Sequence, residues 1–418
     1  MDKSKKIEKL LKFAAHKQDK YDLLTTNLIA PASPTKLNYI NIPMRHATIA
    51  EGRLGNRPYA GAKWFNKIEE IAVEAACSLF NSEHANVQPH SVSQANQAVY
   101  QALLKPNDKV LAMKFESGGH LTHGLPINFS GRFYNFNFYD VGADGYIDYE
   151  ALREQAKKFK PKLIICGASS YPRSFDFEKL SNISKMVGAY LLGDLCHPAG
   201  LIAAGFFPKP FPYCDVVTLT PDKTMLGPHG GIILCKKELS SIIDKSVHPG
   251  VQSSVPLRRI YEIALCLIES SQPWFKDFAK RIIQNTKEFE KVFNKYPQLM
   301  VTGGSDTHLI TINTLNVMGL TGENSENILE QVGILTNRQV VPGDKLKPYV
   351  ASGLRLGTTW ITARGYSRLQ ARRVAEIMLK ILENPNNKKM MSEFKKELFE
   401  ILTQHKPKDI WKGENEKT

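Results

Sequence analysis

The sequence predicts an α/β protein with a mostly parallel sheet covered by helices, followed by a smaller C-terminal α/β unit. Short continuous apolar runs such as Leu163–Cys166 and Val216–Leu219 are typical of strands that are buried on both faces. Helical stretches separate these runs, and strands that alternate with helices indicate a parallel sheet. The chain of 418 residues has room for roughly two to three units of ordinary size.

The elements follow in order along the chain. Residues 1–45 are expected to form an N-terminal arm, because prolines at 31, 34 and 43 interrupt regular structure there. A helix is expected over Phe65–Phe80, where apolar residues recur with helical spacing. Buried strands are then expected at Val110–Met113, Leu163–Cys166, Tyr190–Leu192, Val216–Leu219 and Ile232–Cys235.

The C-terminal part of the chain changes character. Helical patterns dominate from Leu257 to Tyr296, and a second, smaller βα unit begins at Asp306–Leu315. We therefore expect a domain boundary within a helix near residues 275–295. The predicted division is a large domain of residues 46–280 and a small domain of residues 281–418.

Composition excludes several classes of protein. Apolar residues make up 42% of the chain and charged residues 23%, as in ordinary globular proteins. There is no apolar run of about 18 residues and no secretory leader pattern, so we expect a cytoplasmic protein without a membrane partner. The six cysteines are far apart, which indicates neither a disulfide framework nor a zinc ribbon.

The net charge of +14 is compatible with nucleic acid or an anionic substrate as a partner. The lysines of the C-terminal tail alternate with glutamates, and the first 20 residues are similarly mixed, as on solvated helix faces. No aromatic RNA-binding motif and no zinc finger is present. We therefore expect no nucleic-acid partner.

Candidate site residues follow the predicted strands, where ligands of open α/β sheets collect. Asp194 and His197 follow one strand, and Thr220 and Lys223 follow the next. A lysine near a strand end and a glycine-rich turn is suited to imine formation with an aldehyde, although a solvated turn lysine is the alternative. Asp194 is suited to keeping a pyridine nitrogen protonated, with a helix cap as its alternative role.

Three further features admit more than one interpretation each. Ser91 and Ser93 open a helix and either hold a phosphate or only cap that helix. His120 lies in a glycine-rich turn and either stacks on an aromatic ring, is a turn residue, or forms a metal pair with His123, although no cysteine or carboxylate cluster near them in the sequence completes a zinc site. Arg355 either binds a carboxylate or forms a buried ion pair.

In this order, the motifs resemble those of serine hydroxymethyltransferase, a pyridoxal-phosphate (PLP) enzyme of fold type I. The resemblance extends over roughly residues 45–380. It is carried by the segments Ala85–Asn96, Gly118–Gly124, Asp194–Gly200, Lys223–Gly231 and Ser352–Gly357.

The resemblance implies a role for each matching residue. Lys223 would bind the cofactor covalently, Asp194 would contact its pyridine nitrogen, and Arg355 would bind the carboxylate of an amino-acid substrate. His120 would stack on the ring, and Ser169 and His197 would lie near its phenolic oxygen. The full set of implied cofactor contacts is Ser91, Val92, Ser93, His120, Ser169, Asp194, His197, Thr220 and Lys223. No metal is implied.

The resemblance also implies a homodimer with shared active sites. Glu51 and Tyr59 would handle protons near the substrate hydroxyl, and they would reach into the site of the neighbouring subunit. With Lys223 and His120, they complete the implied catalytic set.

Several positions depart from the family motifs. Asp222 replaces the histidine of Thr-His-Lys, His229 replaces the arginine of Gly-Pro-Arg, and Ile49 replaces a tyrosine. Val92 replaces the glycine of Ser-Gly-Ser, and Gln339 replaces an asparagine near the folate contact. Residues 252–256 also differ from the Gln-Gly-Gly-Pro segment. We therefore expect tetrahydrofolate-dependent serine cleavage to be slow or absent.

The predicted function is PLP-dependent cleavage or formation of the Cα–Cβ bond of a β-hydroxy amino acid, of the serine and glycine type used in one-carbon metabolism. A threonine-type aldolase or a transaldolase is the enzymatic alternative. A degenerate relative that keeps the PLP fold but binds a partner through its basic surface is the alternative from another class.

Overall fold

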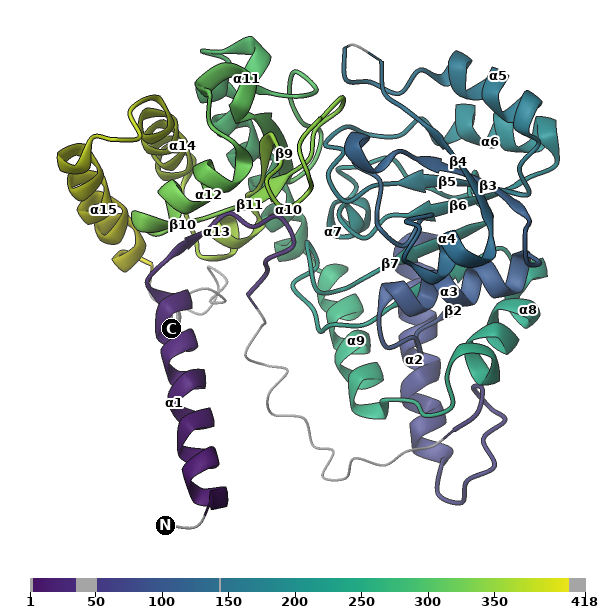
Figure 1. Ribbon diagram of the computed structural model, residues 1–418. Coiled ribbons are helices and arrows are strands. Elements are labelled where there is room, and N and C mark those ends of the chain that lie inside the picture. Colours follow the sequence, from purple (N-terminus) through teal and green to yellow (C-terminus); the bar gives the residue numbers. More distant parts are fainter. Residues whose placement is uncertain (1–2, 35–50, 143, 406–418) are drawn as a thin grey trace.

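The computed structural model describes residues 3–34, 51–142 and 144–405, which form two sheet-containing units and a protruding N-terminal helix (Figure 1). The larger unit contains a seven-stranded sheet, and the smaller unit contains a three-stranded sheet. Helices surround both sheets. The α/β class with a mostly parallel central sheet, which the sequence predicts, is confirmed.

The large sheet contains all five predicted strands and two more. Only β8 runs against the others. β4 begins with an asparagine and has a second one between its aromatic residues, and β2 has only three residues. Neither strand therefore forms the continuous apolar run by which a buried strand is recognised. In spatial order the strands are β2 (His84–Asn86), β8 (Ile232–Cys235), β7 (Val216–Leu219), β6 (Tyr190–Asp194), β5 (Leu163–Gly167), β3 (Lys109–Met113) and β4 (Asn135–Tyr139).

Alternate residues of the central strands pack on opposite faces of the sheet. In β5, Ile164 and Cys166 belong to one apolar core, and Leu163 and Ile165 belong to another. This two-sided burial explains the unbroken apolar runs in the sequence. The first core includes α2 (Lys63–Phe80), α5 (Tyr149–Phe159), α6 (Phe177–Val187) and α9 (Leu257–Ser270), and the second includes α3 (Val92–Leu103) and α8 (Ser240–Lys245).

The long helix α10 (Pro273–Phe293) passes from the larger unit to the smaller one. Phe275 and Phe278 belong to the core of the large sheet, whereas Phe289 and Phe293 belong to the core of the smaller unit. The predicted domain boundary falls within this helix and stays a prediction. Two short helices, α4 (Phe129–Phe133) and α7 (Ala199–Ala203), lie elsewhere in the larger unit.

The smaller unit has an antiparallel sheet in the order β11 (Asn337–Gln339), β12 (Gly353–Gly357) and β9 (Leu309–Asn313). The lysine-rich C-terminal tail is only partly a solvated face, because Met391, Phe394 and Leu398 bury one side of its helix in the second unit's core. The helices of this unit are α11 (Thr314–Met318), α12 (Gly322–Gln331), α13 (Thr359–Ala363), α14 (Arg368–Glu383) and α15 (Lys388–Thr403).

The N-terminal segment begins with α1 (Lys3–Leu23), which extends away from both units (Figure 1). The following strand, β1 (Thr26–Asn27), pairs in parallel with β10 (Ile334–Leu335) of the smaller unit. Leu28 is buried in the core of that unit. Among the described residues, no helix combines the length and the apolar character that a membrane span requires.

Candidate active site

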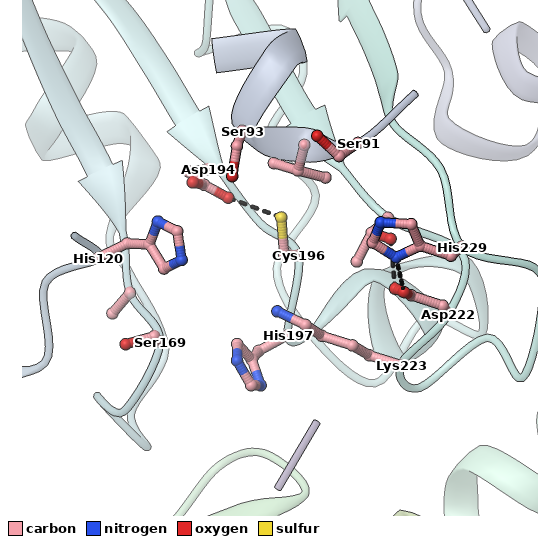
Figure 2. A pocket seen from close by; sticks show the side chains of 13 residues that line it. Ser91, Ser93, His120, Ser169, Asp194, Cys196, His197, Asp222, Lys223 and His229 are labelled. Carbon is pink, nitrogen blue, oxygen red and sulfur yellow. Dashed lines mark hydrogen bonds and ion pairs between the residues drawn. The ribbon is translucent and has the colours of Figure 1, made fainter. Parts of the chain in front are cut away.

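A cavity opens beside the carboxyl ends of β5, β6 and β7, next to the start of α3 (Figure 2). It contains about 580 Å³ of space between protein atoms. The chain crossings of the sheet bring together groups that are far apart in the sequence. The predicted residues that line the cavity are Ser91, Val92, Ser93, His120, Ser169, Asp194, His197, Thr220 and Lys223.

Lys223 lies in the turn after β7, and its side chain extends toward the middle of the cavity (Figure 2). The turn is fixed by Thr224, whose Oγ1 donates to the carbonyl of His197 at 2.9 Å. A Cβ at Gly200 would lie 2.4 Å from the carbonyl oxygen of Thr224. Only glycine therefore allows α7 to approach the turn that carries Lys223.

Asp194 ends β6 at the floor of the cavity and is 5% exposed. Its Oδ2 accepts hydrogen bonds from Asn96 Nδ2 and His123 Nε2, both at 2.9 Å, and its Oδ1 accepts one from Cys196 Sγ at 2.8 Å. Burial acts to raise the pKa of this carboxyl group, but the hydrogen bond and charge of His123 and the charge of His120 outweigh it and lower the pKa. The floor therefore carries an ionised carboxylate.

Asn96 and His123 are floor residues that the sequence did not identify. Asn96 Oδ1 accepts from Thr218 Oγ1 at 2.7 Å, so the amide is held on both sides. Asn96 is fully buried among the apolar residues of α3, and a polar residue on such a face is the signal that could have identified it. His123 was considered only as a turn residue or as part of a metal pair.

His120 is half-buried, and its Nδ1 lies 2.7 Å from Thr122 Oγ1. Burial lowers the pKa of its imidazole to about 4, so the ring facing the cavity is neutral near pH 7. His120, His123 and Asp194 each offer a metal-ligand atom, and these atoms lie within 4.8 Å of one another. Asp194 is far from the two histidines in the sequence, and the fold places it beside them at the end of β6.

Ser91 caps α3, since its Oγ accepts from the backbone nitrogen of Gln94 at 3.3 Å. Capping is therefore part of its role, while its side chain also lines the cavity. The turn after Lys223 packs against this helix start. A Cβ at Gly231 would lie 2.6 Å from the carbonyl oxygen of Ser91, so only glycine permits the contact.

Arg355 comes from β12 of the smaller unit and does not itself line the cavity, but it contacts Ser169, which does. Its Nη1 donates to the carbonyl of Ser169 at 2.7 Å, and its Nε donates to Asn337 Oδ1 at 3.3 Å. Burial lowers the pKa of its guanidinium to about 10, which leaves it charged near pH 7. Both of these hydrogen-bond partners are neutral groups, and the role of Arg355 stays a prediction.

His197 is buried and stacks on His308, with ring centroids 5.4 Å apart and an angle of 13° between the rings. His197 Nδ1 lies 3.3 Å from His308 Nε2. Burial and the positive charges of Lys223 and Arg355 lower the pKa of both imidazoles, that of His308 to about 3. His308 was missed because it precedes a strand in the smaller unit, far from the motifs.

Glu51 and Tyr59 do not line the cavity of their own chain. Tyr59 is 42% exposed, and Glu51 is half-buried beside Gly52, whose carbonyl accepts from Gln88 Nε2 at 3.1 Å. Ile49 lies outside the described residues. The lining is completed by Ala168, Cys196, Asp222 and His229.

Comparison with known proteins gives one consistent family. The model of the family described as serine hydroxymethyltransferase matches residues 4–378. The chain is 44% identical over 342 residues to a serine hydroxymethyltransferase of Mycoplasma mycoides subsp. mycoides, with 82% of this chain and 83% of the relative covered. It is 41% identical over 388 residues to that of Mycoplasma capricolum subsp. capricolum, with 93% of each chain covered.

A third relative comes from another genus. The chain is 43% identical over 363 residues to a serine hydroxymethyltransferase of Lactobacillus gasseri, with 86% of this chain and 88% of the relative covered. The match to the family model extends over both units and includes every segment on which the resemblance in the sequence rests. The chain belongs to the serine hydroxymethyltransferase family.

Proposed function

We propose that the cavity at the ends of β5, β6 and β7 binds PLP and an amino acid, and that serine and glycine are interconverted there. The chain is an enzyme of a PLP-dependent family. The observation that carries the assignment to this cavity is that Lys223 and the ionised Asp194 line one space, and that Arg355 donates a hydrogen bond to Ser169 of the same lining.

The residues of the cavity fit the chemical groups of PLP. Ser91 and Ser93 offer hydroxyl groups beside the first turn of α3, where backbone amides favour a phosphate. The buried carboxylate of Asp194 suits a protonated pyridine nitrogen, and the neutral ring of His120 suits the face of an aromatic system. Val92 and Thr220 also line the cavity, and Ser169 and His197 lie across it from Ser91 and Ser93 (Figure 2).

When bound, PLP withdraws electrons from the Cα atom of an amino acid and so weakens the bonds at that atom. Lys223 holds the cofactor covalently through Nζ. Asp194 keeps a proton on the pyridine nitrogen, and its hydrogen bonds from Asn96 and His123 fix its orientation. Arg355 binds the carboxylate of the amino acid and thereby orients the bonds at Cα.

We also propose a homodimer in which Glu51 and Tyr59 act in the neighbouring subunit's cavity. Both lie outside the cavity of their own chain. The helix α1 exposes Ile7, Leu10, Leu11 and Phe13, and each is more than half exposed. An apolar face on a helix that extends from the body is suited to burial against a second copy.

Mixing two inactive variants tests the shared site. Lys223→Ala removes the lysine of one cavity, and Glu51→Gln removes a group expected to act in the neighbouring cavity. A mixed dimer then contains one complete site only if Glu51 acts across the interface. Recovery of serine cleavage on mixing supports the proposal, whereas two variants that stay inactive together as a mixed dimer would contradict it.

The same proposal includes the arrangement and location of the enzyme. The division into residues 1–45, 46–280 and 281–418 is supported by the two apolar cores that meet along α10. A cytoplasmic location is supported by the six cysteines, all of which are free. The family implies tetrahydrofolate as the carbon acceptor. Because of the substitutions at 339 and 252–256, we expect tetrahydrofolate-dependent cleavage of serine to be slow or absent.

The direct test is a spectroscopic titration of the purified protein. We expect PLP to bind, its absorbance to change on addition of glycine, and serine to be converted to glycine. Lys223→Ala should abolish this conversion. Faster cleavage of threonine than of serine would instead support the threonine-type aldolase.

A further inference from the structure

Two residues at the rim of the cavity depart from the family motifs, and the fold pairs them with each other. Asp222 stands where the motif has histidine, and His229 stands where it has arginine. His229 Nδ1 forms a hydrogen bond and ion pair with Asp222 Oδ2 (Figure 2). Both side chains line the cavity, so the two substitutions form one local unit.

Neighbouring groups hold this pair in place. Thr220 Oγ1 forms hydrogen bonds with Asp222 Oδ1 and with the carbonyl of Gly230, the latter at 2.9 Å. Arg259 Nη1 donates to the backbone carbonyl of His229. The backbone nitrogen of Gly231 donates to the carbonyl of Pro89 at 3.0 Å, which keeps the turn against the start of α3.

The pair lies on the side of the cavity where an anion is expected. His229 lies near Ser91, which caps α3, and the two line the same wall (Figure 2). A carboxylate alone at this place would repel a phosphate. A histidine that donates to the carboxylate from Nδ1 still has Nε2, and a protonated imidazole can donate to a second anion from that atom.

The exposure of the two side chains agrees with an arrangement in which the histidine contacts a ligand and the carboxylate contacts the histidine. The side chain of Asp222 is 27% exposed, whereas that of His229 is 66% exposed. The imidazole therefore lies on the open side of the pair, and the carboxylate lies behind it. A carboxylate that fixes one ring nitrogen while the other binds a ligand is a common arrangement in histidine sites.

We propose that His229 binds the phosphate of PLP through Nε2, and that Asp222 is a positioning residue that holds its imidazole through Nδ1. This inference rests on the proposed function of the cavity. Under this proposal, the substitutions at 222 and 229 act together in binding the cofactor.

Comparison of two cofactor forms tests the assignment. PLP and pyridoxal, which lacks the phosphate, are titrated into the apoprotein, and binding is followed by absorbance. His229→Gln should weaken PLP binding about tenfold or more, because a charge-assisted hydrogen bond is lost, and should leave pyridoxal binding within about twofold. Asp222→Asn should weaken PLP binding in the same selective way, by a smaller factor.

Two further variants serve as controls. His229→Arg places a permanent cation and several N–H donors at the position, and it should retain PLP affinity within about threefold of the unchanged protein. His90→Gln makes the same substitution beside Ser91 but outside the cavity, and should leave PLP affinity within about twofold. Thermal unfolding of each apoprotein establishes that the variants fold.

The outcomes separate the inference from the proposed function. Failure of the unchanged protein to bind PLP would contradict the proposed function itself. If the unchanged protein binds PLP, an equal loss of PLP and pyridoxal affinity in His229→Gln would overturn the role of His229. PLP affinity that His229→Gln leaves unchanged, or that His90→Gln lowers equally, would overturn it as well.

Discussion

The floor and the rim of the cavity differ in burial and in their agreement with the family motifs. The floor, formed by Asn96, His123 and Asp194, is at most 5% exposed, and hydrogen bonds connect all three side chains. The rim pair, Asp222 and His229, is partly solvated. All three floor residues lie in segments that match the family motifs, whereas both rim residues depart from those motifs. A buried charge depends on each of its partners, while a solvated pair can be exchanged together at little cost.

The largest effect is expected from removing the charge at the floor. Asp194→Ala leaves Asn96 Nδ2 and His123 Nε2 without their buried partner and should lower the free energy of unfolding by about 3–5 kcal/mol. Asp222→Ala should lower it by less than about 1 kcal/mol, because that pair is partly solvated. Urea unfolding of the two apoproteins measures both values, and equal losses would remove the distinction between floor and rim.

Arg355 distinguishes the wall of the cavity from the rim. Arg355→Ala should weaken glycine binding by about 2–5 kcal/mol, because a bidentate partner of the substrate carboxylate is lost. PLP binding should change far less, in contrast to the loss of PLP affinity expected for His229→Gln. Titrations with glycine and with PLP measure the two affinities. Unchanged glycine binding would exclude Arg355 as the carboxylate ligand.

The stability of the apoprotein should fall as the pH decreases below about 6.5. The pKa of His308 is lowered to about 3 and that of His120 to about 4, so the unfolded chain takes up protons that the folded chain does not. His308 alone should then contribute a loss on the order of 2 kcal/mol at about pH 5. Unfolding measured at several pH values should show a shallower loss for His308→Gln, and an identical slope would contradict the assignment.

The smallest effect concerns the carbon acceptor. Gln339 Nε2 donates to the carbonyl of Val340 at 3.1 Å, so its amide is engaged beside its own backbone. Gln339→Asn restores the shorter side chain of the family motif, and positioning within about 0.5 Å matters for catalysis. We expect this variant to increase the stimulation of serine cleavage by tetrahydrofolate severalfold. Strong stimulation of the unchanged protein would show that the longer amide is tolerated.

Much of the fold could be predicted because burial leaves a pattern in the sequence. The five central strands are apolar on both faces, and the apolar face of α10 packs into two cores. The edge strand β4 was missed because solvent on one side admits Asn135 and Asn137. Asp194 and Lys223 could be predicted as site residues because each follows a strand, and ligands of open α/β sheets bind at the carboxyl ends of the strands.

The supporting residues of the site could not be predicted in the same way. Asn96, His123 and His308 contact the site residues only after helices and strands from different parts of the chain pack together. The residues next to them in the sequence do not reveal these contacts. The pairing of Asp222 with His229 likewise depends on how one turn folds back on itself.

The covalent attachment of the cofactor to Lys223 is the most direct test. The protein is incubated with PLP and reduced with borohydride, and the modified peptide is identified by mass spectrometry. We expect the label on Lys223, and we expect Lys223→Arg to prevent specific labelling. A stoichiometric label on any other lysine would contradict the placement of the active site in this cavity.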